Sequence, residues 1–171
     1  YQIGEYLLAA VGSKEDIPAS EVSLIAHHFL RGASCIPPAE RLNASDILYL
    51  AGKLGKQLGS YQEAMVFGQQ TKALLLEGYA CAADAWSAQE TRLYATYELL
   101  CDLHSVMAQA ASAEEDYNDA LQFITEPLAR LTINSNQVQY LANQQKFDQT
   151  IQVIIQVLFE FGYEWNEGVT L

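Results

Sequence analysis

The sequence predicts an all-α protein of about eight helices, arranged as antiparallel hairpins. Apolar residues recur at spacings of three and four along most of the chain, which is the period of an amphipathic helix, and no segment is convincingly a strand. Short breaks that contain Gly, Pro or charged residues separate these segments. Half of the 171 residues are apolar and 18% are charged, so the chain has enough apolar surface to fold around a core.

The charge balance restricts the partners. The formal net charge is −12, and the nine Lys and Arg residues are scattered along the chain. Nucleic acid and membrane surfaces are therefore excluded as main partners, and we expect protein partners. No apolar run reaches the roughly 20 residues of a membrane span. Cys35, Cys81 and Cys101 are widely spaced, and we interpret them as reduced, mostly buried thiols of a cytoplasmic protein.

We expect residues 1–171 to form a single helical-repeat domain. The chain begins at Tyr1 and no signal-peptide pattern is present, which we interpret as a fragment of a larger multidomain protein. Residues 1–36 are expected to hold two leading helices. The first covers Gln2 to Ala10, and the second runs from Pro18 to Arg31.

Residues 37–77 are expected to form the core hairpin. Pro37 and Pro38 open its first helix, and a second helix follows after a short break. The second helix starts at Ser60 with Glu63 three positions later, which fits a capping box. The first helix is expected to bury five large residues and to place four small residues at helix contacts; these are Leu42, Ile47, Leu50, Leu54 and Leu58, and Ala44, Ala51, Gly52 and Gly55.

A second hairpin is expected over residues 90–131 and a third over 135–162. Residues 79–89 before them are expected to be a connection, with a partly helical segment as the alternative. The second helix of the second hairpin is expected from Tyr117 to Leu131, and Pro127 should kink or divide it. Its inward residues are expected to be Ala120, Leu121, Ile124, Leu128 and Leu131.

A short signature recurs at three helix starts. It has an aromatic residue in the first turn and a small residue three positions later. We expect the aromatic residue to pack under the preceding helix and the small residue to let two helices approach. The signature residues are Gly59, Tyr61 and Ala64, then Tyr117 and Ala120, and then Phe147 and Thr150. The spacings of 56 and 30 residues differ from the about 34 residues of a regular tetratricopeptide repeat. We therefore predict an irregular tetratricopeptide-like array; the alternative is an antiparallel bundle whose turns contain aromatic residues.

No catalytic, cofactor or metal site is predicted. The run from Ala51 to Lys56 contains Gly and Lys but lacks the spacing of a phosphate loop. His27 and His28 are adjacent and point about 100° apart on a helix, so they cannot readily bind one metal ion together. Cys101 and His104 share a helical face, where packing is the expected role. A small helical enzyme that uses these two residues is a remote alternative.

Packing motifs along most of the chain resemble one kind of helical region. The motifs are Tyr1 to Gly4 with Leu7 and Leu8, His28 to Ala33, Glu40 to Leu42, Leu50 to Gly52, Tyr61 to Ala64, and Leu74 with Leu75. Trp86, the helix after it and residues 141–162 fit the same pattern. The chain is similar to the tetratricopeptide-like part that follows the AAA-type, STAND-class ATPase module of large hybrid sensor histidine kinases. Among these are fungal kinases with a Ser/Thr kinase-like N-terminus.

The resemblance implies that catalysis belongs to other parts of the parent protein and that this segment needs no cofactor. Its expected role is protein interaction or signal transmission within a stress-responsive phosphorelay. The surface that we expect to take part is the groove between the 37–77 hairpin and the helices after Glu90. A free-standing tetratricopeptide-like adaptor outside kinases is the alternative.

Overall fold

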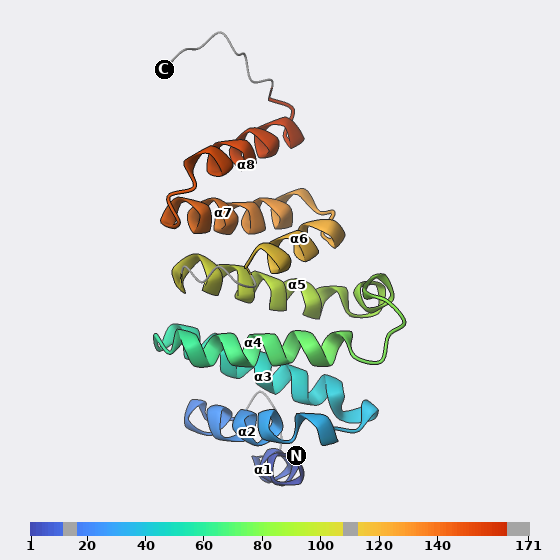
Figure 1. Cartoon of the computed structure of the whole chain (residues 1–171). Coiled ribbons are helices and arrows are strands. Elements are labelled where there is room, and N and C mark those ends of the chain that lie inside the picture. Colours follow the sequence, from blue (N-terminus) through green and yellow to red (C-terminus); the bar gives the residue numbers. More distant parts are fainter. Residues whose placement is uncertain (12–16, 108–112, 164–171) are drawn as a thin grey trace. The chain divides into compact units, whose positions relative to one another are not determined.

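The computed structural model describes residues 1–11, 17–107 and 113–163. Within these ranges the protein is all-α, as predicted, with eight α-helices, two short 3-10 turns and no strand (Figure 1). The elements are α1 (Gln2–Val11), α2 (Ala19–Arg31), η2 (Ala33–Cys35), η3 (Pro38–Glu40), α3 (Arg41–Gln57), α4 (Tyr61–Leu76), α5 (Ala82–Met107), α6 (Ala113–Phe123), α7 (Pro127–Asn143) and α8 (Phe147–Glu160).

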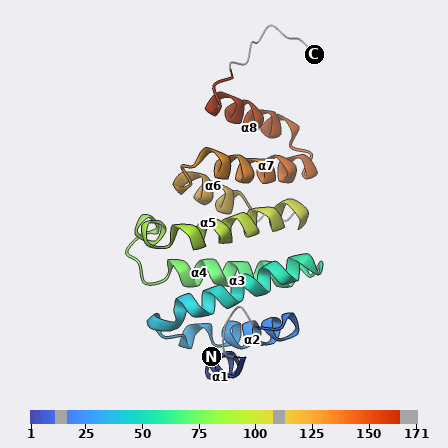
Figure 2. The ribbon, with the colours of Figure 1, turned by 180° about the vertical axis from the view of Figure 1, so that it is seen from behind.

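The helices belong to two compact units. Unit 1 is Tyr1–Leu103 and unit 2 is His104–Leu171, so the division falls inside α5. The single helical-repeat domain expected over residues 1–171 stays a prediction. The opposite view in Figure 2 shows the two helices of the hairpin α3–α4 side by side within unit 1.

The hairpin α3–α4 agrees closely with the 37–77 hairpin that the sequence predicts. Its helices run antiparallel, because an ion pair of 2.7 Å joins Arg41 at the start of α3 to Glu77 just after α4. The turn between them needs a left-handed residue, and Gly59 supplies it with a φ of 77°. The N–H of Ser60 then donates to the carbonyl of Gly55, which closes the turn.

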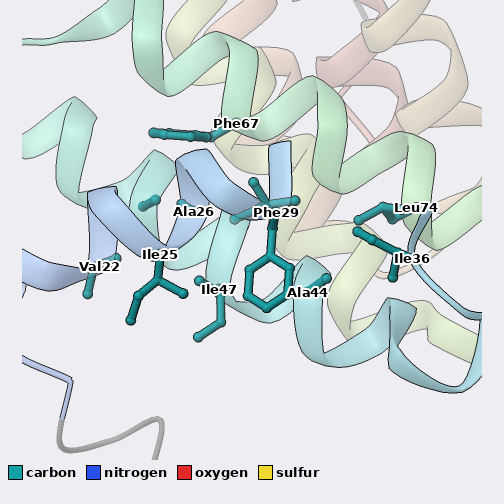
Figure 3. Packing of buried hydrophobic residues seen from close by; sticks show 11 residues of the cluster. Val22, Ile25, Ala26, Phe29, Ile36, Ala44, Ile47, Phe67 and Leu74 are labelled. Carbon is teal, nitrogen blue, oxygen red and sulfur yellow. The ribbon is translucent and has the colours of Figure 1, made fainter. Parts of the chain in front are cut away.

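An apolar core joins α2 to the hairpin in unit 1 (Figure 3). Its members are Val22, Ile25, Ala26, Phe29, Ile36, Ala44, Ile47, Leu48, Ala51, Phe67 and Leu74. Phe29 and Phe67 are each 1% exposed. Burial of one such side chain stabilises a fold by about 1.5–3 kcal/mol. The packing of α2 on α3 and α4 is therefore mainly apolar.

The buried face of α3 consists mostly of small residues, so the predicted inward face is wrong in part. The buried residues are Ala44, Ser45, Ile47, Leu48, Ala51, Gly52 and Gly55. Leu42, Leu50 and Leu58, which we expected inside, are exposed. A Cβ on Gly55 would lie only 3.3 Å from the Cβ of Ala64. The axes of α3 and α4 are therefore too close for leucine between them.

The capping box predicted at the start of α4 is not formed. Ser60 is the N-cap residue, but its side chain makes no capping hydrogen bond. The carboxylate of Glu63 binds residues of α2 instead: the Nε2 of His27 lies 2.7 Å away, and the hydroxyl of Ser23 donates to it over 3.3 Å. Glu63 thus links α4 to α2, because a partner on the neighbouring helix is within its reach.

Helix α5 begins inside the segment that we expected to be a connection. It starts at Ala82, before the predicted start at Glu90, and departs from helical geometry only at Gln89, where φ is −132°. Trp86 is 5% exposed, and its ring stacks on Tyr97 at 5.4 Å between ring centres. The alanines of this segment favour a helix, and the buried indole fixes the segment to the rest of α5.

Pro127 divides the predicted helix, which is one of the two outcomes expected for it, and starts a new helix in unit 2. The sequence predicted a helix over residues 117–131, but α6 ends at Phe123 and α7 begins at Pro127. Proline suits a first helical position, since the N–H that it lacks has no partner there. The side chain of Glu126 caps the same end by accepting from the N–H of Ala129.

The division at Pro127 changes the bounds and the inward residues of the later hairpins. The expected hairpins over 90–131 and 135–162 are wrong in their bounds, because α7 continues through Ser135 and pairs with α8. Leu128 and Leu131 are 67% and 37% exposed, although we expected them inside. Leu128 and Leu131 belong to α7, a separate helix. The three- and four-residue spacing of inward residues in α6 therefore does not predict which way these two leucines point.

Candidate functional site

Unit 1 contains a groove between α3 and α5. Its volume is about 410 Å³, and it is lined by Ser45, Asp46, Tyr49, Thr71, Leu75, Thr91, Arg92, Ala95 and Thr96. Thr71 and Leu75 of α4 are 1% exposed and form its floor. The groove lies where the sequence predicted one, between the 37–77 hairpin and the helix that follows Glu90.

Two ion pairs show that α3 and α5 run in the same direction. Arg92 donates through Nε and Nη2 to the two carboxylate oxygens of Asp46 over 2.8 and 3.3 Å. Further along both helices, Lys56 pairs with Asp102. Both pairs join residues that are 46 positions apart. The two helices therefore advance together, while α4 runs in the opposite direction.

Glycines let α5 approach both α3 and α4. A Cβ on Gly52 of α3 would lie 3.0 Å from the Cδ2 of Leu99, and a Cβ on Gly68 of α4 would lie 2.8 Å from the Cδ2 of Leu100. Neither position has room for a larger residue without movement of its neighbours. The run from Ala51 to Lys56 therefore contributes to helix packing.

The buried hydroxyls of the groove are already bonded. Ser45, Thr71 and Thr96 each donate to a carbonyl oxygen three or four residues earlier in their own helix, over 2.7 to 2.8 Å. At these three positions the hydroxyl proton is already used, and a ligand also meets the apolar surfaces of Tyr49 and Ala95.

Charged groups stand around this apolar wall. Burial raises the pKa of the Tyr49 phenol, and the nearby charge of Glu98 raises it further, so the phenol stays neutral near pH 7. The Nζ of Lys53 lies 5.7 Å from the centre of the Tyr49 ring. The hydrogen bond to Asp46 raises the pKa of Arg92, which favours the charged pair. Since both partners are partly exposed, the groove edge offers one cation and one anion.

The repeat-turn signature lies outside this groove and shapes helix contacts. Its small residues are buried, with exposed fractions of 0%, 0% and 9% for Ala64, Ala120 and Thr150. Among its aromatic residues only Tyr117 is buried, in the second turn of a helix that begins at Ala113. Tyr61 and Phe147 are 37% and 62% exposed, so the expectation that they pack under the preceding helix is wrong. Both occupy the first position of their helix, where the side chain can point outward.

The candidate reactive groups take part in packing. His27 binds Glu63, as described above, and so links α2 to α4. Cys101 is 0% exposed, and the Nε2 of His104 lies 2.8 Å from an oxygen of the equally buried Asp116. A thiol nucleophile must reach its substrate, which Cys101 does not. In the three ranges that the structure describes, no group of three or more His, Cys, Asp or Glu residues is placed to hold a metal ion.

The cysteines differ from the prediction of mostly buried thiols. Cys35 and Cys81 are exposed, and only Cys101 is buried. Cys35 ends the short η2 turn and Cys81 precedes α5, so neither lies on the inward face of an α-helix.

The sequence analysis missed the residues that form the groove edge, which are Asp46, Tyr49 and Arg92. Asp46 and Tyr49 come from α3 and Arg92 comes from α5, and only the direction and register of these two helices bring them together. The sequence contains one signal, the equal offset of the pairs Asp46–Arg92 and Lys56–Asp102. That offset has a meaning only once both segments are known to be parallel helices.

Comparisons with known proteins give no match. No family model matches the chain, and neither a curated protein nor a solved structure matches it. Among the helices of the described residues, none is both long enough and apolar enough to cross a membrane.

Proposed function

We propose that this chain is a non-catalytic segment for protein interaction and signal transmission, and that it binds its partner in the groove of unit 1. The groove itself is the observation that supports the proposal most. It has apolar walls, a charged edge and a volume of about 410 Å³, which is within the ~300–1,000 Å³ of typical ligand pockets. Such a surface suits one or two side chains of a peptide segment better than a small polar substrate.

The lining favours a partner segment that combines a large apolar side chain with charged groups. The apolar side chain packs on Tyr49, Leu75 and Ala95. Arg92 and Asp46 at the edge meet a carboxylate and a basic group of the partner, which fixes its register. The net charge of −12 favours a partner surface that is not acidic.

The resemblance described above supports an extension of the proposal to the parent protein. We propose that the parent is a large hybrid sensor kinase in a stress-responsive phosphorelay. In that setting the partner is either another module of the same kinase or a separate signalling protein. The free-standing adaptor uses the same groove and differs only in what lies outside this segment. Identification of the partner therefore separates the two.

A pull-down with groove variants tests the proposal. The purified chain serves as bait in lysates from cells with and without peroxide stress, and mass spectrometry identifies the retained proteins. Thr91→Trp fills the groove from an exposed position of α5. Ala73→Trp adds the same bulk at an exposed position of α4 that does not line the groove. We expect a partner that the wild type and Ala73→Trp retain equally and that Thr91→Trp loses at least tenfold.

The identity of the retained proteins decides between the two settings. ATPase or kinase modules among them support the sensor kinase, whereas a partner unrelated to kinases supports the adaptor. A partner that all three baits retain equally contradicts the groove as the binding surface.

A further inference from the structure

The hairpins α3–α4 and α7–α8 share one backbone design, although they belong to different units. Helices α3 and α7 each contain 17 residues, and adding 86 to the bounds of α3 gives those of α7. In the turns, Gly59 and Gln145 both have a positive φ, of 77° and 58°. The N-cap residues Ser60 and Lys146 have φ values of −83° and −85°, and the N–H of each donates to the carbonyl five residues earlier.

In the first hairpin, α5 covers one face of α4. The contact at Gly68 is so close that a Cβ there would lie 2.8 Å from the Cδ2 of Leu100. One turn later, the Nζ of Lys72 lies 5.3 Å from the ring centre of Tyr97. Leu75 continues the same face and is 1% exposed. Since residue numbers rise on α4 while they fall on α5, the two helices are antiparallel.

The corresponding face of α8 is apolar and open to solvent. The positions equivalent to 65, 68, 72 and 75 hold Ile151, Ile154, Leu158 and Phe161. Ile151, Ile154 and Phe161 are 53%, 41% and 41% exposed, and Phe147 at the start of the same stripe is 62% exposed. In the part of the chain that the structure describes, α7 is the helix that packs along α8. Open apolar stripes of this kind mark interaction sites.

We propose that this face of α8 binds an amphipathic helix of a partner protein, which lies on α8 as α5 lies on α4. The partner helix runs antiparallel to α8. Ile154 of α8 occupies the position that Gly68 has in α4. Two large side chains cannot share the space at this contact, so the partner helix carries Ala or Gly at the position that Leu100 has in α5. This second docking surface belongs to unit 2 and does not depend on the groove of unit 1.

The charges beside the stripe favour a basic partner helix. Helix α8 contains no Lys or Arg, and its first turn exposes Asp148. The cations next to it are already paired: Lys146 lies 3.1 Å from Glu114, and Arg130 lies 3.0 Å from Glu160. Lys or Arg residues along the edges of the partner's apolar stripe therefore complement this surface.

A peptide derived from α5 is the probe. A fluorescent peptide has the sequence of residues 90–107 with the changes Leu100→Ala, Glu90→Lys and Glu98→Lys, and its binding to the full chain is followed by fluorescence anisotropy. We expect saturable binding, and at least tenfold weaker binding to the Ile154→Asp variant. The matched control Gln152→Asp, an exposed polar position of α8, should change the affinity less than about twofold. A peptide that keeps Leu100 should bind at least fivefold more weakly.

Several results overturn the proposal. One is the absence of binding to the full chain, and another is equal binding to wild type and Ile154→Asp. Dimerisation of the chain in light scattering that Ile154→Asp abolishes also overturns it, because the occupant is then a second copy. Thermal unfolding of each variant shows whether it is folded. If Ile154→Asp unfolds, Ile151→Asp at the more exposed position takes its place.

Discussion

The two compact units bury polar groups in different ways. In the described part of unit 1, the buried polar residues carry hydroxyl groups, and Ser45, Thr71 and Thr96 each donate within their own helix. In unit 2 Thr150 also donates to a carbonyl four residues earlier, but a pair of buried side chains is joined between helices, since His104 of α5 lies 2.8 Å from Asp116 of α6. A bond within one helix does not fix a neighbour, whereas a bond between two helices does.

Unit 2 surrounds this pair with further polar and aromatic residues. The ring of Tyr117 lies 6.4 Å from that of His104 and 5.7 Å from that of Tyr140, between ring centres. The amide of Asn143 in α7 donates to the carbonyl of Ser105 in α5 over 2.8 Å. The core of unit 1 is therefore held together by shape and apolar burial, with its polar links between helices at partly exposed positions. The core of unit 2 depends in addition on specific polar partners. The difference predicts which substitutions each unit tolerates.

The largest effect is expected when the buried pair of unit 2 is broken. Asp116→Ala leaves His104 without this partner in the core and should cost about 3–5 kcal/mol of the free energy of unfolding. Hydrogen exchange should lose protection in α6 and α7 while α2 to α4 keep theirs. The control Glu115→Ala, one position away and exposed, should cost less than about 1 kcal/mol. An equal loss of hydrogen-exchange protection in both units would contradict the claim that only unit 2 depends on this polar pair.

The second effect tests shape in unit 1. Gly68→Leu places a side chain against the fully buried Leu100 and should destabilise by about 1–3 kcal/mol through overpacking. Ala73→Leu introduces the same final side chain at an exposed position of the same helix and should change stability by less than about 0.5 kcal/mol. Denaturant unfolding measures both variants. Similar values for the two would mean that α5 does not pack closely on α4.

A smaller effect of opposite sign is expected in unit 2. Within the described residues, the buried hydroxyl of Tyr140 has no hydrogen-bond partner. Tyr140→Phe should therefore stabilise the protein by up to about 1 kcal/mol, seen as a higher melting temperature. Tyr163→Phe is the control, because Tyr163 is 65% exposed. A clear loss of stability in Tyr140→Phe would indicate a partner for the hydroxyl.

The smallest effect concerns an ion pair at the surface of unit 2. The hydrogen bond from Arg130 lowers the pKa of Glu160. A lowered carboxyl pKa stabilises the fold above the ordinary pKa of glutamate, near 4.3, and this contribution disappears as the pH falls through the folded value. Because the pair is partly exposed, Glu160→Gln should cost less than about 1 kcal/mol at pH 7, and the cost should be smaller at pH 3. A difference that stays constant between these pH values would contradict the assignment.

Sequence reasoning worked best where the determinant is local. The hairpin α3–α4 follows from the prolines before it and from Gly59 in its turn. At Pro127 it left two outcomes open, because a proline after several helical residues fits both a kink and a new helix start, and the structure shows the new start. The exposed Leu42 and Leu50 show a second limit. A helix with leucines on one face and small residues on another does not reveal from sequence which face its neighbours cover.

The sequence predicted where the groove lies but not which residues form its edge. Its position follows from the order of the hairpin and α5, which the sequence indicates. The contact between Asp46 and Arg92 and the burial of Tyr49 depend on the parallel register of α3 and α5. That register is set by the contacts of Gly52 and Gly68 with α5, which no sequence pattern shows in advance.

Site-specific photo-crosslinking tests the role of the groove most directly. A photoreactive residue replaces Thr91 in the groove or, as a matched control, Ala73 outside it, and the protein is irradiated in cells under peroxide stress. The account predicts a discrete crosslinked partner from position 91 that is absent from position 73. The same crosslinks from both positions, or none from position 91, would contradict the claim that the groove binds a protein partner.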